Sequence, residues 1–162
     1  MIFYHILYLI ISRRDITQSF KYQNRVLVSL ACLYQACILH RSFVSIGLIC
    51  RMYPDVCTDT YLNKFFYKIV DKNLFKLQQP FTQTEILKAI VNYFNINGSA
   101  SKVLSIICVH ISEILPNFKV EHVIGVGIIH TISEISIFDI CMFLGIKVKT
   151  LKLKYSIYKK HV

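Results

Sequence analysis

The stretch ACLYQAC, Ala31–Cys37, places two cysteines around a tyrosine inside a long apolar run. Apolar residues recur at helical spacing from Val26 to Leu39, so the run predicts a buried helix. Cys32 and Cys37 would lie about 140° apart around that helix. Because side chains so far apart cannot bind one metal ion or form a disulfide with each other, we expect them to pack as small apolar groups in a core.

Segments with helical spacing continue on both sides of this helix. The N-terminal half predicts further helices, with a polar connection at residues 13–23 and a loop broken at Pro54: Ile2–Ile11, Phe43–Cys50 and Tyr61–Val70. The C-terminal half predicts a longer series: Thr84–Asn95, Ala100–Leu115, Val120–Ile132, Ile137–Leu144 and Val148–Lys159. Glycine and proline are scarce, at five and three residues, which argues against an all-β sandwich with its many tight turns. The sequence therefore predicts an all-α fold.

The two halves repeat one order of elements: a buried helix, a short helix, a turn and a terminal helix. In each half the buried helix is followed by a serine, two apolar residues, a polar residue and an isoleucine, SFVSI at Ser42–Ile46 and SIFDI at Ser136–Ile140. We therefore expect a duplicated helical unit, with a truncated first copy at residues 1–72, a linker at 73–83 and a second copy at 84–162.

ACLYQAC followed by RSFVSI, Arg41–Ile46, resembles the first cyclin-like repeat of the general transcription factor IIB family. That family has an Ala-Cys-Leu-Tyr-x-Ala-Cys helix and then an Arg-Thr-x-x-Glu-Ile step, in which Ser45 here replaces the acid. SIFDICMFLGIKVKTLKLKY, Ser136–Tyr155, looks like the helix-turn-helix of the second repeat, with Gly145 as the turn glycine and Thr150 in the recognition helix. The B-related factor of the polymerase III system shares both repeats and fits the same motifs.

The resemblance implies two cyclin-like five-helix repeats in tandem, the first of which lacks its first helix. It also implies the core of a general transcription initiation factor, which bridges TATA-binding protein and promoter DNA in the nucleus as the preinitiation complex assembles. RNA polymerase is a weaker expectation as a partner, because the family's N-terminal zinc ribbon is absent from the sequence.

The helix-turn-helix of the family reads promoter DNA, and its residues carry over to the last predicted helix. By this resemblance Lys149, Thr150 and Lys152 would lie at the base-reading end in the major groove. Four further lysines suit contacts to phosphates: Lys147, Lys154, Lys159 and Lys160. Lys21 and Arg25 follow the first repeat's second helix, at a loop that touches DNA in the family.

The charge of the chain is concentrated near its C-terminal end. The formal net charge is +10, and residues 147–162 contain six lysines and no acid, whereas residues 85–146 contain three lysines and five acids. A basic terminal element on a near-neutral body favours nucleic acid as the partner. A solvated, solubilising helix face and the codon bias of an A+T-rich genome are the alternative explanations of these lysines.

Patterns typical of catalysis or metal binding find little support. The six cysteines form no CxxC pair, and GVG at Gly125–Gly127 lies inside a predicted helix, where close glycine–glycine packing against a neighbouring helix explains it. His122 and His130 lie roughly on one side of that helix without a carboxylate partner or a third ligand. Cys32 and His40 would lie ~12 Å apart along the helix axis. We therefore expect no catalytic residue, no metal site, no cofactor and no enzymatic activity.

Two other classes of protein stay open as alternatives. A cyclin proper, which is the regulatory subunit of a protein kinase, uses the same fold and would need an exposed apolar helix face for docking. A small membrane-associated protein would agree with the mean hydropathy of +0.49. However, the N-terminal apolar run at residues 1–12 is shorter than the ~20 residues that cross a bilayer, and residues 120–146 contain three acids. We therefore expect no membrane partner.

Overall fold

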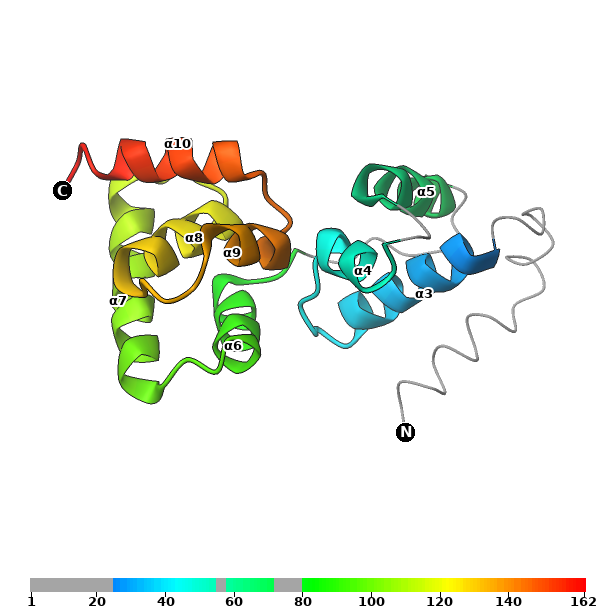
Figure 1. Ribbon diagram of the computed structural model, residues 1–162, viewed down its shortest axis with the longest axis horizontal. Helices are drawn as coiled ribbons and strands as arrows, with labels where there is room; N and C mark the ends of the chain where they lie inside the picture. Colours follow the sequence, from blue (N-terminus) through cyan, green and yellow to red (C-terminus); the bar gives the residue numbers. More distant parts are fainter. Residues whose placement is uncertain (1–24, 55–57, 72–79) are drawn as a thin grey trace. The chain divides into compact units, whose positions relative to one another are not determined.

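The structure, a computed structural model, describes residues 25–54, 58–71 and 80–162 (Figure 1). These residues form eight helices, labelled α3 to α10, and no strand, so the predicted all-α class is confirmed for this part of the chain. The predicted helix Ile2–Ile11, the polar connection at 13–23 and Lys21 lie outside the described residues, as do residues 73–79 of the predicted linker.

The chain divides by its internal packing into two units, Met1–Pro80 and Phe81–Val162, which are described separately here. The described helices of the first unit are α3 Arg25–Leu39, α4 Ile46–Met52 and α5 Asp59–Asp71. Those of the second unit are α6 Gln83–Tyr93, α7 Gly98–Ile114, α8 Val120–Thr131, α9 Ile137–Leu144 and α10 Val148–Tyr158.

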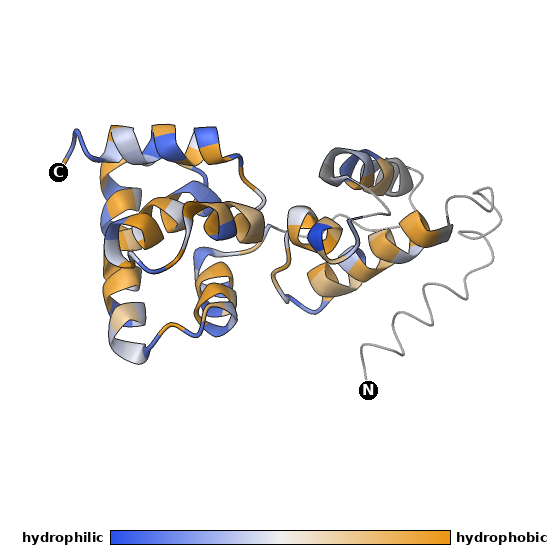
Figure 2. Cartoon of the chain, in the orientation of Figure 1, coloured by the Kyte–Doolittle hydropathy of each residue, from blue (hydrophilic) through white to orange (hydrophobic). Residues whose placement is uncertain are grey.

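The ACLYQAC stretch lies in α3, and Figure 2 shows hydrophobic residues along most of this helix. Ala31 and Cys32 are fully buried among residues of α4 and α5, and Cys37 is 7% exposed. Tyr34 packs edge-on against Phe66 of α5, with the ring centroids 4.9 Å apart. Burial raises the pKa of the Cys32 thiol to about 12, which keeps it protonated and unreactive at neutral pH. The predicted packing role of these cysteines is confirmed.

Helix α4 begins three residues later than the sequence predicts. Ser45 is its N-cap, and the Ser45 side chain accepts a hydrogen bond from the Leu48 N–H at 3.1 Å. In the second unit Ser136, the single serine of SIFDI, caps α9. The two five-residue steps therefore begin their helices at different positions, SFVSI at its fourth residue and SIFDI at its first.

Helix α8 is the centre of the second unit and packs against α6, α7, α9 and α10. Its residues 123–128 are all buried, as expected for a helix that is apolar nearly all round. Around it, Thr82 and Glu85 form a capping box at the start of α6, and the Asn97 side chain caps α7. Figure 1 shows α10 along one side of the unit, with α6 and the start of α7 on the opposite side.

The two glycines of the GVG motif let neighbouring helices approach α8 from opposite sides, since residues two apart point about 200° apart around a helix. A β-carbon on Gly125 would lie 2.8 Å from Cδ1 of Leu151 in α10, and one on Gly127 would lie 2.9 Å from Sγ of Cys108 in α7. The predicted packing role is confirmed, but the expectation of glycine against glycine is wrong. Each glycine makes room for a larger side chain.

The cap of α9 gives a direct test of this architecture. The Ser136 hydroxyl accepts a hydrogen bond from the Asp139 N–H at 3.1 Å, so we expect Ser136→Ala to lower the free energy of unfolding by about 1 kcal/mol. Ser105→Ala is the matched control, because the Ser105 hydroxyl lies within α7 and donates to the Ser101 carbonyl. Such back-bonding slightly destabilises helices, so the control should be neutral or stabilising. Urea unfolding of the full chain measures both, and equal effects would contradict the cap.

Candidate nucleic-acid interface

Helices α9 and α10 are joined by a turn of three residues, 145–147, a length found in helix-turn-helix motifs. Gly145 ends α9 in the left-handed conformation, with φ 69° and ψ 32°, which glycine adopts without steric penalty. The Ile146 N–H then donates to the Cys141 carbonyl at 3.0 Å and closes the end of the helix. The predicted role of Gly145 as the residue that ends α9 is confirmed.

One side of α10 fixes the helix to the rest of the unit. Leu151 is fully buried against α8, and Tyr158 is 1% exposed. The Tyr158 ring packs edge-on against His130 of α8, with the ring centroids 5.2 Å apart. Burial, together with the nearby Tyr155, raises the pKa of the Tyr158 hydroxyl. These contacts hold α10 with a fixed side facing outward.

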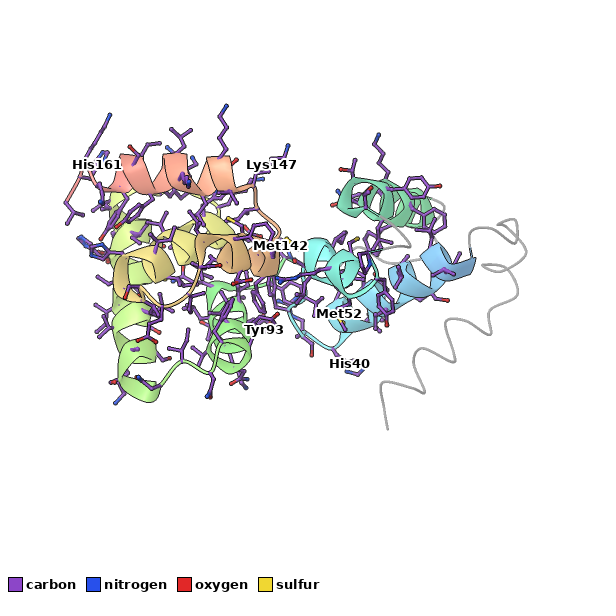
Figure 3. The ribbon with its side chains drawn as sticks, viewed as in Figure 1. His40, Met52, Tyr93, Met142, Lys147 and His161 are labelled. Carbon is purple, nitrogen blue, oxygen red and sulfur yellow. The ribbon has the colours of Figure 1, made fainter. Side chains whose placement is uncertain are left out.

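The outward side of α10 is basic. The exposed residues within the helix lie three, four and seven positions after the first of them, which places them on one face: Lys149, Lys152, Leu153 and Ser156. Lys147, Lys159 and Lys160 are exposed next to the two ends of the helix. Figure 3 labels Lys147 and His161 at the two ends of this helix and shows nitrogen-tipped side chains that project from it away from the unit. Because residues 147–162 contain no acid, the face has no neutralising charge on its own helix.

Two further lysines of this region are held against aromatic rings. Lys154 is half-buried, and its Nζ lies 4.3 Å from the ring centroid of Phe118, in the connection between α7 and α8. Lys159 is exposed, and its Nζ lies 5.0 Å from the ring centroid of Tyr155, one turn earlier. An ammonium group over an aromatic face is stabilised by the ring quadrupole, so both side chains have a favoured direction.

Seven of the nine predicted DNA-binding residues lie together on α10 or next to its ends: Lys147, Lys149, Thr150, Lys152, Lys154, Lys159 and Lys160. Thr150 is half-buried near the start of the helix. Arg25 is the first residue of α3, in the other unit, and Lys21 lies outside the described residues. The structure therefore groups the C-terminal set on one helix of the second unit.

Sequence reasoning missed Phe118, Lys119 and His122, which the fold brings to α10 from the start of α8. His122 is half-buried, and its pKa is lowered from the ordinary 6.5, first by burial and then by the positive charge of Lys154. Lys119 adds to this lowering, whereas Glu121 acts in the opposite direction. The aromatic residue and the lysine that follow Pro116 were the available signal, but nothing in the sequence assigns them to α10.

The lowered pKa of His122 predicts a loss of stability in acid. The unfolded chain takes up this proton near pH 6.5, and the folded chain takes it up only at lower pH. The contribution of His122 is therefore complete above pH 6.5 and falls as the pH drops through the lowered pKa. We expect His122→Gln to flatten the pH dependence of the free energy of unfolding between about pH 8 and pH 5. A pH dependence identical to that of the unchanged protein would contradict this assignment.

Other chemistry has little structural support among the described residues. They contain no cluster of three His, Cys, Asp or Glu side chains that could hold a metal ion, and none of their helices is long and apolar enough to span a membrane. Cys32 is fully buried whereas His40 is exposed, so these two do not form a pair. Burial also raises the pKa of the Cys108 thiol to about 12.

Comparison of the chain with known protein families, with curated proteins and with solved structures finds no match.

Proposed function

We propose that this chain is the core of a general transcription initiation factor, which bridges TATA-binding protein and promoter DNA. The observation that carries the proposal is the exposed basic face of α10, presented after a three-residue turn and fixed from behind by Leu151 and Tyr158. The resemblance of ACLYQAC and of the α9–α10 sequence to the transcription factor IIB family supports the same function, with the B-related factor as the other member that fits.

In this proposal α10 lies in the major groove of DNA, whose width admits one helix. Lys149, Thr150 and Lys152 near the start of the helix meet base edges, as the N-terminal residues of recognition helices do. The remaining lysines contact phosphates, which fix the position of the protein without reading the sequence.

A gel-shift assay with TATA-box DNA, with and without TATA-binding protein, tests the proposal. We expect a ternary complex of all three components at low salt, where lysine–phosphate contacts are strongest. The complex should be lost in the presence of excess heparin, a competing polyanion. If no ternary complex forms at low salt, the proposed function is wrong.

A cyclin-type regulatory subunit of a protein kinase is the second candidate, and one observation favours it. Helix α7 exposes three large aliphatic side chains on its outer side: Val103 at 49%, Ile106 at 68% and Val109 at 53%. An exposed apolar helix face is what kinase docking would need. A kinase-activation assay in which Ile106→Ser abolishes activation would favour this candidate, whereas the basic face of α10 has no role in it.

A further inference from the structure

The contact between Phe118 and Lys154 joins two segments that are far apart in the chain. Phe118 precedes α8, and Lys154 lies in the middle of α10. Because the Lys154 ammonium lies 4.3 Å from the Phe118 ring centroid, it is held beside the start of α8. Lys119, the next residue, is exposed there, and both lysines act on the pKa of His122. Two ammonium groups from different elements therefore converge on one patch.

This patch lies on one flank of α10, next to its buried side. Counted around the helix axis from Lys149, Lys154 is displaced by about 140° in one direction, close to the buried Tyr158, whereas Lys152 and Lys159 are displaced by about 60° and 80° in the other. Lysines therefore lie on both flanks of the helix. Lys154 is the most buried of the lysines of α10, and a half-buried lysine extends its ammonium toward solvent along the apolar surface.

We propose that Lys119 and Lys154 bind phosphates of one DNA strand while Lys159 binds a phosphate of the other strand. The inference rests on the proposed function, because it takes α10 to lie in the major groove. A helix in that groove has a sugar-phosphate backbone along each of its edges. On the flank of α10 where Lys154 lies, the second cation is Lys119 from the start of α8.

Phe118 is a positioning residue for this contact. It touches no phosphate itself, but its ring holds the Lys154 ammonium beside the start of α8. The charges of Lys154 and Lys119 both lower the pKa of His122, and Glu121 acts in the opposite direction. Protonation of His122 adds a third positive charge to the patch, so DNA should bind more tightly as the pH falls below 6.5, and His122→Gln should remove that increase.

The test uses the full chain with TATA-binding protein and TATA-box DNA, and it measures affinity by fluorescence anisotropy over a range of salt. We expect the Lys119→Gln/Lys154→Gln variant to reduce the slope of log K against log salt by about 2, and affinity at 0.1 M salt by on the order of 10- to 100-fold. The matched control is Lys88→Gln/Lys102→Gln, which removes the same charge from exposed lysines of α6 and α7, on the opposite side of the unit in Figure 1. The control should change the slope far less.

Neutral methylphosphonates placed on one strand at a time test the assignment to strands. The unchanged protein should lose affinity when either strand is neutralised along the site. For the Lys119→Gln/Lys154→Gln variant, methylphosphonates on one of the two strands should no longer reduce affinity. For Phe118→Leu, methylphosphonates on that same strand should reduce affinity less than they do for the unchanged protein.

The outcomes separate the two proposals. If the unchanged protein does not bind this DNA at all, the proposed function fails and the strand assignment fails with it. If it binds but the double variant keeps the full salt slope, or stays sensitive to both strands, only the strand assignment is overturned.

Discussion

Charge reversal of Lys149 and Lys152 to glutamate is expected to abolish the complex with TATA-box DNA. Both side chains are exposed on the outward face of α10, and reversal replaces two attractions to the DNA with two repulsions. For the unchanged protein, the four lysines assigned to phosphates predict a slope of log K against log salt of about −3.6. Affinity should therefore fall by roughly 10²-fold between about 50 and 200 mM salt.

The control for this prediction is the same reversal at Lys88 and Lys102, which are exposed on α6 and α7. It changes the net charge by the same amount, so it separates a local contact from a general effect of charge. A complex that survives reversal at Lys149 and Lys152, or that is lost equally in the control, would mean that α10 is not the DNA-binding helix.

Leu151→Ala is expected to lower the free energy of unfolding by about 2–5 kcal/mol, since removal of a fully buried leucine side chain leaves a cavity. Leu151 is fully buried, and its Cδ1 occupies the space above Gly125. The same change should weaken DNA binding even where the protein stays folded, because Leu151 fixes the side of α10 that faces outward. Urea unfolding followed by circular dichroism, and the gel shift described above, measure the two effects.

A second substitution at Gly125 tests whether the contact itself is responsible. Alanine at Gly125 places a methyl group 2.8 Å from the present position of Leu151 Cδ1, so Gly125→Ala alone is unfavourable at this contact. In the Leu151→Ala background that methyl group enters the cavity. We therefore expect the double variant to be more stable than the sum of the single effects predicts, by about 0.5–3 kcal/mol. Simple additivity would contradict the packing described here.

Most helices could be predicted from the sequence because their ends carry local signals. Thr82, Asn97 and Ser136 cap α6, α7 and α9 through their own side chains, and Gly145 ends α9 with a positive φ. Helix α4 shows the limit of this reasoning. Two serines, Ser42 and Ser45, stand before it. Because serine caps helices well, the sequence periodicity did not decide which of the two begins the helix.

The part of the site that could not be predicted depends on contacts between distant segments. Lysines at 147–160 are visible as a cluster because they share one helix. The contact of Lys154 with Phe118, and the effect of Lys154 and Lys119 on His122, arise from the packing of α10 on α8. Similarly, the spacing of Gly125 and Gly127 predicted close packing but not the leucine and cysteine side chains that use the space.

The absence of acidic residues from α10 also affects the stability of the helix itself. Its N-cap is Lys147, which makes no side-chain capping bond, and its first turn holds no acid. Positive side chains at the positive end of the helix dipole destabilise the helix, and Lys149 and Lys152 repel each other one turn apart. In the free protein, burial of Leu151 and Tyr158 holds α10 against this repulsion. A bound polyanion would relieve this repulsion, so under the proposed function DNA binding would also stabilise the helix that contacts the DNA.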